Sequence, residues 1–236
     1  MRSPLLALAL AVACGVAASN VQAQVDSSIV LESEAFLSAH PDVNNRRRGM
    51  GAYEAGNHEE ALVYFRRAAR YADKPSQAMV AEMLWKGEGG PEDPALAYAW
   101  MDLAAERGYP GFTAIREHYW SLLDAAQRED AVARGAEVYA EYGDEVALRR
   151  METVLRRERR RTTGSRTGFV GALEIQIPGP GGQLEQVSGH RFYDRKLWDP
   201  TLYQAWQDAV WMEPREAQVD VGEVEPLRSD PVPDDD

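Results

Sequence analysis

The sequence predicts a mainly α-helical protein: an α-α superhelical repeat array followed by a small C-terminal unit that contains β-strands. The array is predicted by a helical motif that recurs at an offset of 36 residues and carries small residues along one face in both copies. The strands are predicted by apolar and polar residues that alternate after residue 169. With 236 residues, 44% of them hydrophobic, the chain is long and apolar enough to bury a core.

The two copies of the motif span residues 60–69 and 96–105. In each copy the apolar residues recur at i, i+3, i+4, i+7 and i+8, which places them on one stripe of a helix. Alanines in the stripe let a neighbouring helix approach closely, and the aromatic residue fills the space between hairpins. The aligned pairs are Ala61 with Ala97, Tyr64 with Trp100, Ala68 with Ala104, and Ala69 with Ala105.

Each copy follows another helical segment, so the pattern predicts helical hairpins whose first helices cover 46–55 and 76–86. Gly56-Asn57 is the turn of the first hairpin, and residues 87–93 form the loop of the second. A single hairpin cannot bury its apolar face alone, so the hairpins are expected to stack.

Helix start and stop signals support these boundaries. Asn57 and Glu60 have the spacing of a capping box, and Asp93-Pro94 has the pattern of an N-cap followed by the first helical residue. Gly108 is placed as the glycine that ends the second helix of the second hairpin.

Residues 76–108 resemble a Sel1-like repeat, a relative of the tetratricopeptide repeat. The matching residues are Gly87, Gly89, Asp93, Ala97, Trp100, Ala104, Ala105 and Gly108, and the departures are Ala81, Leu84 and Gly90. Residues 46–72 are more similar to a plain tetratricopeptide hairpin, and 111–142 resemble a degenerate third unit. The resemblance implies a non-enzymatic scaffold that binds another protein or peptide.

In such arrays the first helix of each hairpin lines a concave face. The candidate partner contacts on these helices are Tyr53, Met79, Met83 and Lys86. The sequence does not identify the partner or the oligomeric state.

The third unit also has helical patterns. A helix is expected over 113–123, with Ile115, Tyr119, Trp120 and Leu123 available for burial. Asp124 and Gln127 form a second capping box for a helix that ends near Tyr142-Gly143.

A long helix is expected from Glu145 to about Arg161, and it carries seven arginines but only two glutamates after its first turn. These arginines could bind an acidic partner or anionic lipid headgroups, cover a solvated helix end, or pair with the acidic tail of the same chain. The sequence favours the last two interpretations.

The C-terminal unit is expected to begin with a strand over 169–177, a turn over 178–182 and a second strand over 184–187. A helix opened by Asp199-Pro200 and a further strand over 218–224 follow. The predicted domains are a repeat domain at 27–161, the small α+β unit at 166–224 and an acidic, disordered tail at 225–236.

Six aromatic residues gather within twenty positions of this unit. They could form the core of the unit, with Leu202, Trp206 and Val210 docking its helix onto the repeats. The alternative function is a cell-envelope module whose aromatic rings stack on glycan or peptidoglycan. The six residues are Phe192, Tyr193, Trp198, Tyr203, Trp206 and Trp211.

Residues 1–23 have the features of a signal peptide: Arg2, a short apolar run, and a small-x-small pattern that predicts cleavage before Gln24. We therefore expect a periplasmic or secreted protein. Residues 11–15 loosely resemble a lipobox, so Cys14 is a possible lipidation site and a membrane-anchored lipoprotein is the alternative. No segment is long and apolar enough to predict a transmembrane helix.

The sequence offers no catalytic, cofactor or metal site. The four histidines lack partners at metal-ligand spacing and are expected at the surface or at helix caps; they are His40, His58, His118 and His190. A formal net charge of −12 disfavours binding to nucleic acid. The predicted function is therefore an exported, non-enzymatic protein-binding adaptor.

Overall fold

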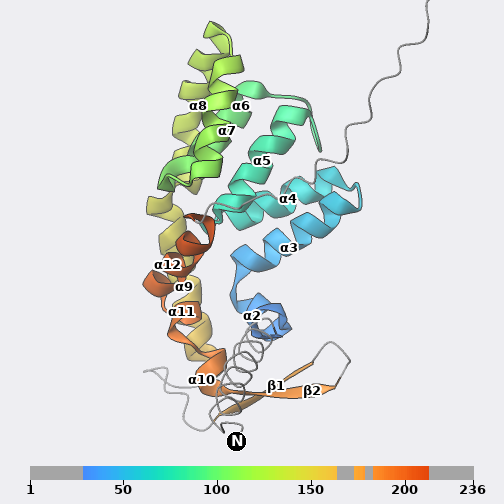
Figure 1. Cartoon of the computed structure of the whole chain (residues 1–236), viewed down its shortest axis with the longest axis vertical. Helices are drawn as coiled ribbons and strands as arrows, with labels where there is room; N and C mark the ends of the chain where they lie inside the picture. The colour runs from blue at the N-terminus through green and yellow to red at the C-terminus, as the bar shows by residue number, and fades with distance from the viewer. Residues whose placement is uncertain (1–28, 164–172, 179–182, 213–236) are drawn as a thin grey trace, which may run out of the picture.

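The computed structural model describes residues 29–163, 173–178 and 183–212. The chain folds into stacked helical hairpins, a long helix, and a small C-terminal unit that runs back along that helix (Figure 1). The elements are α2 (Glu34–Ala39), α3 (Pro41–Glu54), α4 (His58–Ala69), α5 (Lys74–Lys86), α6 (Pro94–Ala104), η1 (Ala105–Arg107), α7 (Pro110–Leu122), α8 (Ala125–Tyr142), α9 (Asp144–Thr163), β1 (Glu174–Pro178), β2 (Leu184–Ser188), α10 (Gly189–Phe192), α11 (Arg195–Trp198) and α12 (Pro200–Met212).

Two packed hairpins begin the repeat array, α3 with α4 and α5 with α6. A third pair, α7 with α8, follows as a looser hairpin whose helices pack on α6 rather than closely on each other. The fold class and the first two hairpins predicted from the sequence are confirmed. The first helix is longer than predicted, because it begins at Pro41, where a proline fits the first helical position. Helix α7 likewise begins at Pro110 rather than at Thr113.

Most of the predicted caps are present. The Asp93 side chain accepts a hydrogen bond from the backbone N–H of Leu96, and Asp124 and Gln127 form a reciprocal capping box. Gly108 ends η1 with a positive φ of 72°. The capping box at Asn57 is wrong: Asn57 is the N-cap of α4, but its side chain makes no capping hydrogen bond.

Gly89 lies in the α5–α6 loop with a φ of +79°, and a Cβ atom at this position would lie 2.6 Å from the backbone oxygen of His58. We expect Gly89→Ala to lower the free energy of unfolding by about 1–3 kcal/mol, because of the strained φ and the backbone clash. Urea denaturation measures the change. Gly90→Ala is the matched control, because a Cβ atom there meets open space. Equal destabilisation by both variants would contradict this account of the loop.

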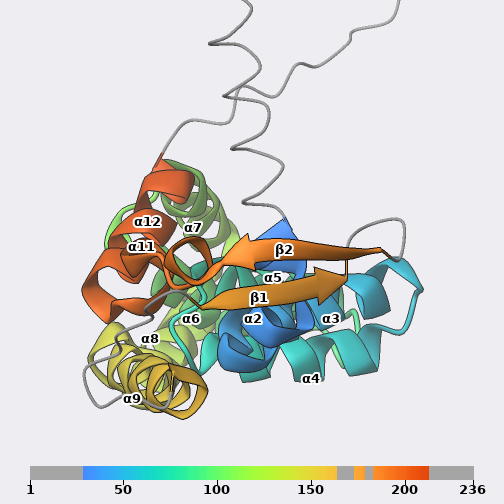
Figure 2. The same cartoon turned by 90° about the horizontal axis from the view of Figure 1, so that it is seen from below.

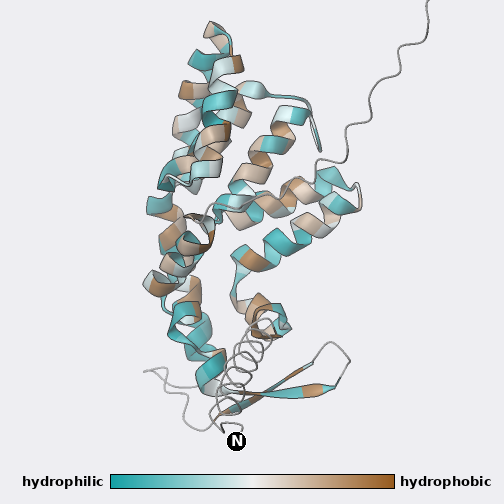
Figure 3. Ribbon diagram, in the orientation of Figure 1, coloured by the Kyte–Doolittle hydropathy of each residue, from teal (hydrophilic) through white to brown (hydrophobic). Residues whose placement is uncertain are grey.

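The core of the array is built from alanines, aromatic rings and a few larger aliphatic residues. Ala61, Ala97 and Ala104 are fully buried, and their small side chains permit the close helix packing that the motif predicts. Between the second and third hairpins, Trp85 stacks on Tyr119 with ring centroids 4.0 Å apart. Figure 3 shows hydrophobic and hydrophilic stretches alternating along the helices, as expected for helices with one buried face.

A second core lies at the end of the molecule that is opposite the α7–α8 pair (Figure 1). It brings residues 29–39 together with residues 177–198. Strands β1 and β2 pair antiparallel, with Ile175 opposite Val187, and the hairpin crosses α2 (Figure 2). This core combines residues on both sides of the predicted boundary between repeat domain and C-terminal unit. Its buried members are Ile29, Val30, Phe36, Leu37, Ala39, Ile177, Val187, Phe192, Tyr193, Leu197 and Trp198.

The aromatic cluster belongs mainly to this core. Phe192, Tyr193, Trp198 and Tyr203 are buried, so these rings cannot stack on a sugar in this conformation. The predicted docking stripe of α12 is wrong, because Leu202 and Val210 are exposed. Tyr203 is buried instead, and Trp206, the third member of the predicted stripe, packs partly against the same cluster.

His40 is a partial correction: it lies at a helix cap as predicted, ending α2 and preceding α3, but it is buried rather than at the surface. Its imidazole is fully buried, stacks on Phe36, and has a backbone oxygen within hydrogen-bond distance of each ring nitrogen; the neutral ring donates to one of them. The partners are the backbone oxygens of Phe36 at 2.9 Å and Leu197 at 2.8 Å. Burial lowers the pKa of His40 below its ordinary value, although Asp42 opposes the shift. His40 therefore links α2 to the C-terminal unit.

Several arginines of α9 pair with residues of the same chain. Arg149 pairs with Glu145, Arg156 with Glu152, and Arg161 with Glu158. Arg150 donates to the backbone oxygen of Glu141 at 2.6 Å. Intramolecular pairing within the described residues therefore accounts for much of this basic surface, with partners on α8 and α9; the predicted pairing with the tail lies outside the described residues. Exposed pairs of this kind contribute about 0–1 kcal/mol each.

Some predictions lie outside the described residues: the leader at 1–23 with Cys14, the turn at 179–182, the strand at 218–224 and the tail at 225–236. Among the helices of the described ranges, none has the length and hydropathy needed to cross a membrane. The described part of the chain also contains no cluster of three or more side chains suited to hold a metal ion.

Candidate functional site

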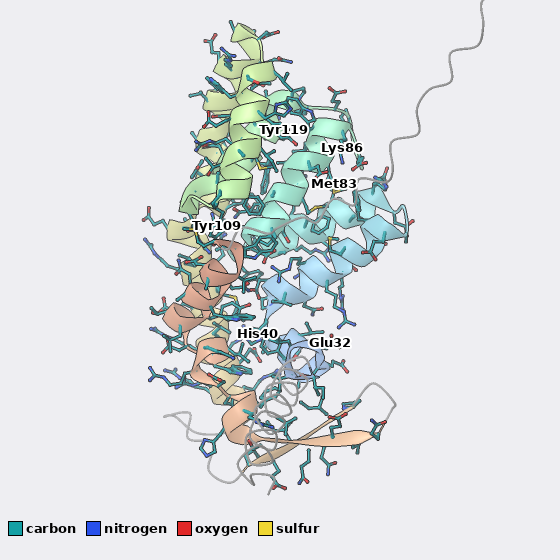
Figure 4. All side chains as sticks on the ribbon, in the orientation of Figure 1. Glu32, His40, Met83, Lys86, Tyr109 and Tyr119 are labelled. Carbon is teal, nitrogen blue, oxygen red and sulfur yellow. The ribbon has the colours of Figure 1, made fainter. Side chains whose placement is uncertain are left out.

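The predicted contact residues lie on or near α5, which lies between the first hairpin and α7 (Figure 1). Met79 is partly exposed, and Lys86 is exposed and pairs with Glu82 at 2.5 Å. Tyr53 of α3 donates a hydrogen bond to Glu88 at 2.9 Å, which places it beside the C-terminal end of α5. Figure 4 shows Lys86 and Tyr119 on the neighbouring helices α5 and α7.

Met83 differs from the other three candidates. Its side chain is 0% exposed and packs in the core of the array, so a partner cannot reach it in this conformation. The physical reason is its position on the helix, because Met83 lies on the side of α5 that faces α4 and α6. Tyr53, Met79 and Lys86 remain candidate contacts.

A stripe of accessible side chains runs along α5 at i, i+4, i+7 and i+11. We call Pro75, Met79, Glu82 and Lys86 the α5 face. Tyr119 stacks on Trp85 beside the C-terminal half of this stripe, and its pKa is raised to about 12, mainly by burial and further by Glu82. At its N-terminal end the stripe reaches a pocket, because Pro75 also lines that pocket.

The pocket is a cavity of about 180 Å³ where α12 faces α3, α9 and the start of α5. One water molecule needs about 10–15 Å³ by the same measure, so the space admits a side chain of a partner. The lining is mixed: aromatic and aliphatic walls surround several charged and amide groups. The residues are Asp42, Tyr71, Ala72, Asp73, Lys74, Pro75, Arg107, Tyr109, Leu148, Arg149, Met151, Glu152, Pro200, Thr201, Tyr203, Gln204, Gln207 and Trp211.

One hydrogen-bond chain crosses the pocket wall from α12 to α3. Gln207 donates to the hydroxyl of Tyr203 at 2.9 Å, and Tyr203 donates to Oδ2 of Asp42 at 2.5 Å. Burial raises the pKa of Tyr203 well above its ordinary value, and the charge of Asp42 adds to this, so the hydroxyl stays a donor. The other carboxyl oxygen, Asp42 Oδ1, is buried and has no hydrogen-bond partner among the described residues.

Beside it lies a partly buried ion pair. Arg46 of α3 pairs with Asp73, the N-cap of α5, whose carboxyl also accepts a hydrogen bond from the backbone N–H of Ser76 at 3.1 Å. Burial raises the pKa of Asp73, and Arg46 offsets part of that rise. Burial also acts to lower the pKa of Arg46, but Asp73 and Asp42 more than reverse this effect.

A larger network joins the second repeat to α9 and α12. Arg107 binds Asp144 through two nitrogens at 2.6 and 2.9 Å and donates to Asp208 at 2.9 Å. Lys74 contacts Glu106 at 2.6 Å and Asp144 at 3.0 Å. Tyr109, labelled beside α12 in Figure 4, donates to Asp208 as well. The network fixes α12 over the pocket.

This network predicts a pH effect. Burial acts to raise the pKa of Asp144, but Arg107 and Lys74 outweigh burial and lower it below its ordinary value. A carboxyl whose folded-state pKa is lowered stabilises the fold above its unfolded pKa, and that contribution is lost as the pH falls. We expect Asp144→Asn to lower the free energy of unfolding at pH 7. The difference in this free energy between the variant and the wild type should shrink below about pH 4. Urea unfolding at several pH values tests this; a constant difference would contradict it.

The pocket was not predicted from the sequence. Asp73-Lys74-Pro75 has the pattern of an N-cap followed by a helix start, and this signal predicts a helix but not the burial of both charges. Asp42 and Tyr203 are 161 positions apart and carry no shared motif. Their meeting depends on the return of the chain along α9, which local patterns do not encode.

A family model described as the Sel1 repeat matches residues 47–70 and 74–109. These segments coincide with the first hairpin and with the second hairpin through η1. Both hairpins are Sel1 repeats. The first hairpin, which resembles a plain tetratricopeptide hairpin in sequence, is therefore of the same kind as the second.

One solved structure similar to this chain is a protective antigen present in uropathogenic Escherichia coli strains, which displays an SLR fold. The two chains are 24% identical with a TM-score of 0.41. The match covers 46% of this chain and 24% of the antigen, so it spans about a quarter of that protein. No curated protein matches the chain. Sel1 repeats generally mediate protein–protein interactions and are typically non-catalytic.

Proposed function

We propose that this chain is an exported, non-enzymatic scaffold that binds a protein partner through the α5 face and the adjoining pocket. The observation that carries the proposal is the α5 stripe, in which partly exposed apolar and charged residues lead from Lys86 to the pocket beside Pro75. The Sel1 repeats supply the class of function. The signal-peptide pattern of residues 1–23 supports export to the periplasm or beyond.

The chemistry of the face suits a peptide segment of a partner. Met79 offers a flexible apolar contact, Glu82 with Lys86 both signs of charge, and Tyr53 of the neighbouring α3 a ring with a hydroxyl. The members of the α5 face recur at three- or four-residue intervals and form a linear track.

Selection of a phage-displayed random peptide library on the purified chain tests the proposal. We expect enriched peptides whose binding is weakened at least tenfold by Met79→Glu, because a buried charge opposes apolar contact. Val132→Glu on α8 is the control, since Val132 is 65% exposed and lies on the second helix of its hairpin. No enriched peptide, or equal weakening by both variants, would contradict the proposed function.

A further inference from the structure

The pocket contains a feature that the fold itself does not use. Asp42 is 2% exposed, and only one of its two carboxyl oxygens is hydrogen-bonded, to Tyr203. Its Oδ1 is buried with no partner among the described residues, although Asp42 lines a cavity large enough for a side chain. A buried acceptor without a donor is costly, so a bound group that carries N–H donors gains from filling it.

The charge around the pocket favours a cation. Lys74 and Arg107 are both neutralised within the network, where the three acids Glu106, Asp144 and Asp208 surround these two bases. On the α3 side the acids Asp42 and Asp73 face one base, Arg46. At the rim, Glu152 lies beside Arg149, and Arg149 itself pairs with Glu145. Each of the two inner clusters therefore has one acid more than it has bases.

The walls suit the rest of a basic side chain. Leu148 and Met151 of α9 present aliphatic surface, against which a methylene stem can pack. Tyr71, Tyr109 and Trp211 bring aromatic rings to the same cavity, and such rings attract arginine and lysine cations. Gln204 adds an amide that can accept a further N–H.

We propose that this pocket is a recognition site for an arginine or lysine side chain of the protein partner, whose N–H group displaces the side chains that cover Asp42 Oδ1 and donates to this oxygen. The proposal rests on the proposed function, because the α5 face would hold the flanking residues of the same peptide. In Figure 4, α12 runs beside the labelled Tyr109 and His40.

The test uses the enriched peptides described above, whose sequences are the first readout. We expect an arginine or lysine at one fixed position. Replacing this base by glutamine in a synthetic peptide should weaken binding to the wild-type chain about ten- to hundredfold, the effect of losing one charge-assisted hydrogen bond in a buried site. Isothermal titration calorimetry measures both peptides.

Asp42→Asn then identifies the pocket as the site. The amide keeps an acceptor for Tyr203 but presents a donor in place of Asp42 Oδ1. Replacing the base of the peptide by glutamine should therefore weaken its binding to this variant less than threefold. Asp130→Asn, an exposed residue of α8, is the matched control and should preserve the full effect. An undiminished effect in Asp42→Asn would overturn the proposal.

A second readout needs no variant and covers the case in which Asp42→Asn does not fold. A photoreactive residue next to the base in the peptide should crosslink to residues 148–152 or 200–211 of the wild-type chain, as mapped by mass spectrometry. Peptides without a conserved base, or crosslinks elsewhere, would overturn the basic-side-chain site and leave the scaffold function standing. The absence of any enriched peptide would instead contradict the scaffold function itself.

Discussion

Arg107→Ala is expected to lower the free energy of unfolding by about 3–5 kcal/mol. Its guanidinium holds Asp144 in a two-nitrogen contact and also reaches Asp208, so one side chain connects η1 with α9 and α12. Removal leaves two acids in a partly buried site without their main cation. The cost of an uncompensated buried charge exceeds the net benefit of the original pair.

Chemical denaturation measures this loss, with Arg116→Ala as the control. Arg116 is more exposed and pairs with Glu117 and Asp102, so its removal should cost less than about 1 kcal/mol. Arg107→Lys should recover only part of the stability, because an ammonium cannot hold two carboxylates in the forked geometry of a guanidinium. Equal losses for the alanine variants at 107 and 116 would show that the network does not fasten α12.

Trp198→Ala is expected to have a comparable effect, about 3–5 kcal/mol, at the opposite end of the molecule. The indole is 1% exposed, donates to the backbone oxygen of Phe192 at 2.6 Å, and lies against His40 and Tyr193. Truncation would leave a cavity in the core that α2 shares with the β-hairpin and α10–α11.

Amide hydrogen exchange distinguishes this loss from general destabilisation. Residues 29–39 and 174–198 should lose protection together, while the Sel1 repeats at 47–109 keep most of theirs. Trp211→Ala is the control, because Trp211 is partly exposed at the end of α12. This substitution should lower the free energy of unfolding by about 1 kcal/mol or less. Protection that persists at 29–39 in Trp198→Ala would contradict a shared second core.

The sequence predicts the features that short-range chemistry determines. The hairpins follow from the 3.6-residue periodicity of their alanines and aromatic residues, and the caps at Asp93 and Asp124 follow from backbone N–H groups that need a partner. Asn57 shows the limit of the same reasoning, because the residue type permits a capping bond that the local geometry does not make.

The features that depend on contacts between distant segments could not be predicted. His40 is buried because its two ring nitrogens meet backbone oxygens of Phe36 and Leu197, the second of them 157 residues away. The exposed positions Leu202 and Val210 show the same limit: helical spacing identifies a stripe, but only the packing of α12 against α9 selects Tyr203 for burial. The pocket around Asp42 likewise exists only because the chain returns along α9.

Site-specific photocrosslinking in the cells that produce the protein tests the scaffold function most directly. A photoreactive amino acid would replace Lys86 on the α5 face or Val132 on α8, both of them exposed. The account predicts a discrete crosslinked protein from position 86 that is absent from position 132 and disappears when Met79→Glu is added. The same crosslinked species from both positions, or none from position 86, would contradict it.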